Sequence, residues 1–263
     1  MISSLFYCKA LDGGYVSLSN GYLLFSALSA RLGDSPAGKT LHERNDEDFF
    51  TLSSIMPDYF WTTFRCAPKN GNIVFEKGAP FAFRVSFLDN DTFEDFSSLI
   101  LGTNLTLGGA AFKVISASKS GDNEMSRRVD MKELSLTPPF SGVSVSFLLP
   151  TGFKSNDRQV IFPTPELFFG SLSLRLQRCI KTEDVFDKTV FSLVLVNSYS
   201  LSSFAARLKN NQIFRGCVGK VRYSFDGLTN TERALLSRLT SLAPFCGVGY
   251  KVAQGMGLVK IQF

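Results

Sequence analysis

The stretch APFCGVGYKVAQGMGLVKI, residues 243–261, joins a glycine-rich loop to an apolar segment that is expected to be the last strand. Lys251 lies within this loop and is flanked by four glycines, Gly247, Gly249, Gly255 and Gly257. Glycine permits positive φ and has no side chain to keep a ligand away, so consecutive N–H groups can converge on an anion, with Lys251 supplying charge. The same spacing is also typical of a tight connection before a terminal strand. The stretch therefore predicts either a phosphate-binding loop or a simple turn.

The segments before this loop predict a βαββαβ unit. Thr229 and Glu232 have the spacing of a helix capping box, and Pro244 is expected to end that helix. An earlier helix opens at residues 164–166, Thr-Pro-Glu, which offer a cap, a proline for the first turn and an acid for the helix dipole. The expected strands are residues 143–149, 190–196, 216–225 and 257–263. The glycine-rich loop thus connects the last helix of the unit to its last strand.

The first half of the chain repeats this order of elements, although the two halves have little sequence similarity. Ser19 or Asn20 can cap its first helix, and Gly33 suits the end of that helix. Residues 34–48 are expected to form a polar loop, and a second, shorter helix stops at Gly102. The expected strands are residues 5–11, 49–55, 73–88 and 110–116.

Between the halves, residues 118–139 turn polar and contain the pair Pro138-Pro139, which makes this segment the best candidate for a linker. The βαββαβ order is that of a ferredoxin-like unit. The sequence therefore predicts an α+β protein of two tandem ferredoxin-like, RRM-like domains, residues 1–120 and residues 140–263. Sheets of this type often bind single-stranded RNA, but many carry other activities, so the fold alone does not give the function.

Composition indicates a folded protein without a membrane partner. Of the 263 residues, 44% are hydrophobic and 26 are Phe, which is ample material for packed cores. The longest apolar stretches are too short to span a bilayer, and the N-terminus lacks a basic leader followed by an apolar region, so we expect a cytoplasmic location. The cysteines are odd in number and never in CxxC spacing, which favours reduced, mostly buried thiols: Cys8, Cys66, Cys179, Cys217 and Cys246.

The net charge of +5 is unevenly distributed. Residues 188–225 contain no acidic residue and hold six basic ones: Lys188, Arg207, Lys209, Arg215, Lys220 and Arg222. Such a segment is either the electrostatic footprint of a polyanion or an ordinary solvated basic face.

His42 is the only histidine of the chain, and it lies in the expected polar loop after the first helix. It is the obvious candidate for chemistry that needs a group titrating near neutrality, and the alternative is an ordinary exposed histidine. One histidine and dispersed cysteines exclude His-rich and Cys-rich metal sites. The sequence also lacks the GxSxG elbow of a Ser-His-Asp hydrolase and the GxxxxGK[ST] phosphate loop. A cluster of carboxylates remains open at residues 46–48, which look more like a solvated loop face.

Four stretches together resemble a known family. GVGYKVAQGMG, residues 247–257, is similar to the C-terminal glycine-rich motif of the CRISPR-associated endoribonucleases that process repeat RNA, the sixth Cas family of the RAMP superfamily. The resemblance continues, in matching order, in GCVGKVRYSF (216–225), FPTPELFFGSL (162–172) and LHERNDEDFFTLSSI (41–55).

The resemblance implies that the protein cuts CRISPR repeat RNA without a metal or another cofactor. In the family a ribose 2′-hydroxyl attacks the scissile phosphate, giving a 2′,3′-cyclic phosphate and a 5′-hydroxyl. It identifies His42, which precedes an FTxS-like motif at residues 50–53, as the catalytic histidine. The best-known companions are a tyrosine of the first helix and a lysine after the histidine. Here Tyr22 lies at the start of that helix and no lysine follows until Lys69, so Lys39 or Arg44 would substitute.

The implied RNA-binding residues are the four glycines with Lys251, together with the basic residues from Arg207 onward in residues 188–225. The implied partners are repeat RNA, other Cas proteins of an interference complex, and a second copy of the chain. The resemblance also leaves room for a non-cleaving RAMP subunit that coats guide RNA, although His42 argues against it. A third alternative is a ferredoxin-like scaffold without an RNA partner, for which the presence of His42 and of the basic segment would be a coincidence.

Overall fold

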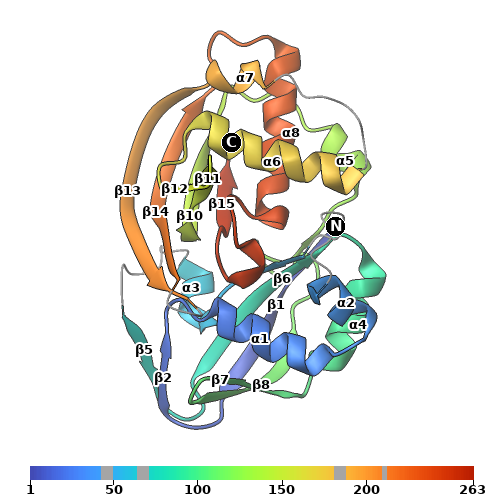
Figure 1. The fold of residues 1–263 in the computed structure, drawn as a ribbon. Coiled ribbons are helices and arrows are strands. Elements are labelled where there is room, and N and C mark those ends of the chain that lie inside the picture. Colours follow the sequence, from blue (N-terminus) through green and yellow to red (C-terminus); the bar gives the residue numbers. More distant parts are fainter. Residues whose placement is uncertain (43–49, 64–70, 181–187, 209–211) are drawn as a thin grey trace.

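The computed structural model describes residues 1–42, 50–63, 71–180, 188–208 and 212–263. These residues form two units, each an antiparallel sheet with its two longest helices on one face, and the second unit stands above the first in the view of Figure 1.

The first unit contains a seven-stranded sheet in the order β3-β6-β1-β8-β7, with β4 also pairing with β6 and β9 with β1. Two further strands, β2 and β5, form a separate ribbon. The strands are β1 (Ile2–Ala10), β2 (Gly14–Ser17), β3 (Phe50–Leu52), β4 (Met56–Pro57), β5 (Asn72–Phe75), β6 (Pro80–Phe87), β7 (Asn104–Leu107), β8 (Ala110–Ala117) and β9 (Arg127–Arg128). The helices are α1 (Gly21–Leu32), α2 (Pro36–His42), α3 (Asp58–Thr63) and α4 (Asn90–Ile100), and α5 (Met131–Ser135) lies in the segment that leads to the second unit.

The second unit contains a four-stranded sheet in the order β13-β14-β10-β15, and β11 and β12 form a small ribbon beside it. The strands are β10 (Gly142–Thr151), β11 (Phe153–Ser155), β12 (Arg158–Val160), β13 (Leu195–Arg207), β14 (Ile213–Ser224) and β15 (Val259–Gln262). The helices are α6 (Pro165–Ile180), α7 (Thr189–Ser192), α8 (Asn230–Cys246) and the 3₁₀ turn η2 (Val252–Gln254).

Both units have the same core topology. In chain order the core elements are β1, α1, β3, β6, α4 and β8 in the first unit, and β10, α6, β13, β14, α8 and β15 in the second. Each sheet then has its second, third, first and fourth core strands side by side in that order, all antiparallel. The prediction of an α+β protein with two tandem ferredoxin-like folds is confirmed.

Among the described residues, three large apolar cores hold the molecule together. In the first unit, Phe6 and Phe83 from the sheet stack at 5.5 Å, and Phe6 packs edge-on against the helix residue Phe96. In the second unit, Tyr223 of β14 packs on Phe168 of α6. A third core lies between the units and contains residues of both: Leu5, Trp61, Ala82, Met125, Leu148 and Leu258. Because this core joins the two units, the position of one is fixed relative to the other.

Several local predictions are wrong, including the single strand expected at residues 73–88, which the structure divides into β5 and β6. The expected polar loop contains helix α2, whose N-terminus is capped by Ser35: the Gly38 N–H donates to the Ser35 hydroxyl at 3.0 Å. The apolar residues from Val190 begin with the single turn α7 before the strand starts at Leu195, because a short apolar run does not distinguish helix from strand. Pro244 does not end α8, since its missing N–H removes one bond only two residues before the helix ends.

The predicted linker takes part in the first sheet. Arg128 of β9 pairs with Ile2, and the amino group of Met1 donates to the Val129 carbonyl at 2.9 Å. The chain then forms α5, where Leu134 joins the core of the second unit. The division into residues 1–120 and 140–263 stays a prediction.

Cys8, Cys217 and Cys246 are buried, and burial raises the pKa of the Cys8 thiol. In the part of the chain that the structure describes, no helix is both long enough and apolar enough to cross a membrane.

Candidate functional site

The glycine-rich stretch of the second unit packs against the first unit. The Gly255 N–H donates to the Leu52 carbonyl at 3.1 Å, and Gly255 forms a parallel bridge with Ser53. On its other side, Gly255 lies against Gly21, the first residue of α1. A Cβ atom built on Gly21 would lie 2.3 Å from the Gly255 Cα atom and 2.5 Å from the Gln254 carbonyl oxygen. The close approach therefore requires glycine at position 21 and places the start of α1 directly on the loop.

All four glycines of the stretch have positive φ, between 63° and 86°, as their residue type predicts. Their N–H groups, however, are already used inside the protein. Besides the bond of Gly255, Gly247 donates to Ala243, Gly249 to the Ser171 hydroxyl and Gly257 to Pro150. Three of the four are buried, and Gly249 is half-buried. The loop thus differs from an open row of backbone donors, and direct binding of RNA by the glycines stays a prediction.

Side chains next to the loop line a hollow of about 460 Å³ with basic and aromatic groups. The Phe214 and Tyr250 rings lie 5.0 Å apart, and the Lys154 ammonium lies 5.7 Å from the centre of the Tyr250 ring. Lys251 and Gln254 complete this side of the hollow, with their side chains 3.3 Å apart. Burial raises the pKa of Tyr250, and the charge of Arg215 acts in the opposite direction, which places Arg215 near the same ring. The hollow combines a stacking surface with positive charge.

Tyr22 of α1 also reaches this region. Its half-buried side chain packs against the cluster of Leu208, Phe214 and Met256. The structure therefore brings three of the predicted site residues together: Tyr22, Arg215 and Lys251. It adds Lys154 and Tyr250, which sequence reasoning missed as site residues. Tyr250 lies inside the quoted glycine-rich stretch, whereas Lys154 has no local signal.

Helix α2 carries the other two predicted catalytic positions. Lys39 is exposed, and His42 is the last residue of the helix; the structure does not describe the His42 side chain. Asp95 of α4 accepts the Ala37 N–H at 2.9 Å, and Gly38 lies so close to the Gly33 carbonyl that a Cβ atom would be 2.1 Å from its oxygen. These contacts fix α2 against both α1 and α4.

Tyr22 lies in the first turn of α1, whereas α2 follows the last turn of that helix (Figure 1). Tyr22 is the second residue of α1, and the rise from there to Leu32 at the end of the helix is about 15 Å, which separates Tyr22 from the point where the chain turns into α2. The pairing of Tyr22 with His42 stays a prediction. Arg44 and residues 46–48 lie outside the described residues.

The basic segment is divided between two places. Lys220 and Arg222 of β14 are exposed on the sheet face that points away from α6 and α8. There they pair with serines on both neighbouring strands: Lys220 with Ser200 and Ser146, and Arg222 with Ser198 and Ser144. A shallow hollow of about 500 Å³ contains both basic residues. Position 207 ends β13, Lys188 precedes α7, and Lys209 lies outside the described residues.

Asn20 fixes the segment that connects these parts. It is fully buried, its amide nitrogen donates to the carbonyls of Ser17 and Ile55 at 2.8 and 2.9 Å, and its amide oxygen accepts the Ile55 N–H at 2.8 Å. These bonds join the start of α1 to the segment after β3, beside Gly255.

We expect Asn20→Ala to destabilise the protein by about 2–3 kcal/mol or more, because it leaves buried backbone groups of Ser17 and Ile55 without partners. Urea unfolding monitored by circular dichroism measures this change. Asn90→Ala, at the half-buried first residue of α4, is the matched control and should change stability little; equal effects would show that the buried bonds of Asn20 are not what stabilises this junction.

Within the described ranges, no three His, Cys, Asp or Glu side chains gather closely enough to hold a metal ion.

Several known proteins are similar to this chain. The family model for the CRISPR-associated endoribonuclease Cas6 matches residues 145–259. A Cas6 endoribonuclease of Streptococcus thermophilus is 29% identical over 125 residues, which are 45% of this chain and 50% of the relative. One from Mycobacterium tuberculosis (strain CDC 1551 / Oshkosh) is 25% identical over 226 residues, which are 80% of this chain and 69% of the relative.

Among solved structures, a product complex of Thermus thermophilus Cas6 (TTHB231) superimposes with a TM-score of 0.78 at 21% identity, covering 100% of both chains. This likeness supports the fold of the whole chain. The match to the Streptococcus relative spans about half of that protein's length.

Proposed function

Because this chain belongs to the Cas6 family of CRISPR-associated endoribonucleases, we propose that it cuts CRISPR repeat RNA to produce guide RNAs. The observation that carries the proposal is the alignment of 80% of the chain with an endoribonuclease of this family. The chemistry available on α2 agrees with it, since the only histidine of the sequence lies there.

The reaction we propose needs no metal ion. The ribose 2′-oxygen forms a bond to the scissile phosphorus while the bond from phosphorus to the 5′-oxygen breaks, which leaves a 2′,3′-cyclic phosphate. A proton must leave the 2′-hydroxyl, and another must reach the departing 5′-oxygen. His42 performs one of these transfers, because an imidazole can hold or release a proton near neutral pH. Lys39 and Tyr22 are the companions proposed to stabilise charge on the phosphate.

The path proposed for the RNA begins at the basic and aromatic hollow beside the glycine-rich stretch. There the half-buried Tyr250, backed by the buried ring of Phe214, offers a ring for base stacking, and Lys154, Lys251 and Arg215 offer charge for phosphates. The path continues to Lys220 and Arg222, whose sheet face also carries serine hydroxyls that can bind phosphate oxygens. Arg207, the last residue of β13, and Lys209, which follows it in the sequence, remain part of the proposed RNA-binding set.

The triple variant Arg215→Ala, Lys220→Ala, Arg222→Ala should bind repeat RNA more weakly and with a flatter salt dependence. Each lost contact to a single-stranded phosphate lowers the slope of log K against log salt by about 0.7, so the expected decrease is about 2. Fluorescence anisotropy at several salt concentrations measures it. A variant in which three exposed lysines of the first unit, Lys77, Lys113 and Lys119, are replaced by alanine removes the same net charge and is the control. Identical slopes for wild type and the triple variant would remove β14 from the RNA path.

Other Cas proteins of an interference complex, a second copy of the chain and a cytoplasmic location stay predictions that follow from the sequence. The decisive experiment for the enzymatic function is incubation of the purified protein with end-labelled repeat RNA in EDTA. We expect a single cut, and no cut in RNA with a 2′-deoxy sugar immediately upstream of the scissile phosphate. Cleavage that disappears in EDTA and returns with magnesium would contradict the mechanism, and tight binding without any cleavage would favour a non-cleaving RNA-binding subunit.

A further inference from the structure

A hollow of about 290 Å³ lies between the two units, away from the glycine-rich stretch. One wall is the edge strand β15 with the end of α8; the other is the segment from Glu124 to Thr137 together with Arg84 of β6. Most of the lining is apolar, including Val129, Leu134, Phe245 and Ile261. Two arginines, Arg84 and Arg127, stand out in such surroundings.

Arg84 is only 3% exposed, and its Nε–H donates to the Met125 carbonyl at 2.8 Å. Burial, followed by the neighbouring charge of Arg127, lowers the pKa of Arg84 to about 9, so the guanidinium is still protonated at neutral pH. Among the described residues Arg84 forms no ion pair. A buried charge is normally paired, because an unpaired one loses its hydration without compensation.

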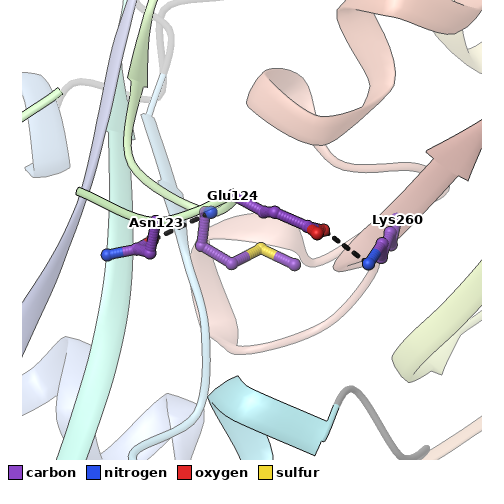
Figure 2. Close-up of polar contacts among 4 residues, drawn as sticks. Asn123, Glu124 and Lys260 are labelled. Atoms are coloured by element: carbon purple, nitrogen blue, oxygen red, sulfur yellow. Dashed lines mark hydrogen bonds and ion pairs between the residues drawn. The ribbon is translucent and has the colours of Figure 1, made fainter. Parts of the chain in front are cut away.

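The two carboxylates that line the hollow form their contacts with groups other than the two arginines. Glu124 forms an ion pair of 2.5 Å with Lys260 of β15, and Figure 2 shows this contact across the junction of the units. Glu133 belongs to the capping box of α5, where its side chain accepts the Asp130 N–H. The positive charge of Lys260 is thereby balanced, whereas those of Arg84 and Arg127 are not balanced by either glutamate.

We propose that this hollow is a binding site for a phosphate-type oxyanion, held by Arg84 from inside and by Arg127 from the rim. The planar guanidinium offers paired donors that match phosphate oxygens, and binding there would supply the counter-charge that Arg84 lacks. The oxyanion is either a backbone phosphate of the RNA or free phosphate. The first source rests on the proposed function, and the second does not.

Neighbouring residues of β9 supply a matched pair of variants. Arg127 and Arg128 are both exposed, but only Arg127 lines the hollow. Thermal unfolding is measured in sodium phosphate and in sodium chloride of equal ionic strength, without RNA. We expect phosphate to raise the melting temperature of wild type and Arg128→Ala by several degrees more than that of Arg127→Ala. Arg84→Met should also lose the phosphate-dependent rise in melting temperature. If this variant does not fold, the comparison of Arg127→Ala with Arg128→Ala tests the proposal.

The source is then determined with repeat RNA made uncleavable by a 2′-deoxy sugar. If an RNA phosphate occupies the hollow, Arg127→Ala lowers the salt slope of binding by about 0.7 relative to Arg128→Ala. Equal slopes, together with the loss of the phosphate-dependent increment only in Arg127→Ala, identify free phosphate as the ligand. The proposal is overturned if phosphate shifts all variants equally and the slopes of the two arginine variants agree. The phosphate measurement contains no RNA, so its outcome is independent of whether the protein cuts RNA.

Discussion

Replacing His42 with alanine should reduce the cleavage rate of repeat RNA by about 10²- to 10⁴-fold, the usual loss when general acid–base help is removed. RNA affinity should remain close to that of wild type, because the proposed binding surfaces lie on the glycine-rich stretch and β14, whereas His42 lies on α2. Single-turnover cleavage and anisotropy on the same RNA separate the two quantities.

Thr40→Ala is the matched control for His42→Ala. Thr40 lies on the same short helix, and its hydroxyl donates to the carbonyl of Pro36, one turn earlier in the helix, at 3.2 Å. We expect Thr40→Ala to cleave at nearly the wild-type rate, which shows that a substitution in α2 does not by itself stop the reaction. Undiminished cleavage by His42→Ala would remove this residue from the mechanism.

Replacing Gly21 with alanine should destabilise the protein by about 1–3 kcal/mol or more, the range for overpacking a tight contact. The added methyl group would collide with Gly255 and with the Gln254 carbonyl, both backbone groups that cannot rotate away. For a chain of this size the melting temperature falls by about 2–4 °C per kcal/mol. Cleavage should fall with it, because the contact positions α1 against the glycine-rich stretch.

Gly170→Ala is the control, and we expect it to change the melting temperature in the opposite direction. Gly170 lies within α6, and a Cβ atom there would meet nothing within 4 Å. Glycine in a helix is about 0.5–1 kcal/mol less favourable than alanine, so Gly170→Ala should raise the melting temperature. If Gly21→Ala melts at or above the wild-type temperature, the close contact between α1 and the loop is not what holds the units together here.

The fold could be predicted where the signals are local. Thr229 and Glu232 form the expected capping box, and the sheets follow the expected order of elements. Helix α2 was missed although Ser35 and Pro36 are good starting residues, because Gly38 disfavours a helix. That glycine is required by the approach of α2 to the Gly33 carbonyl, a contact that only the folded chain reveals.

The residue types of the candidate site could be predicted from the sequence, but the contacts between those residues could not. The positive φ of Gly255 follows from its residue type, whereas its hydrogen bond to Leu52 joins residues about two hundred positions apart. The sequence likewise places Arg84 in an apolar strand without revealing that it is buried between the units. Long-range contacts decide which hydrogen-bond donors remain available to a ligand. A local sequence pattern does not contain such contacts.

The central claim is that the protein cuts repeat RNA through the 2′-hydroxyl, and the mass of the upstream RNA fragment made in EDTA tests it most directly. The account predicts that this fragment ends in a 2′,3′-cyclic phosphate and that its downstream partner begins with a 5′-hydroxyl. Water attack would instead add one water to the mass of the pair and leave no cyclic phosphate. An upstream fragment with a 3′-hydroxyl, accompanied by a downstream fragment with a 5′-phosphate, would contradict the account.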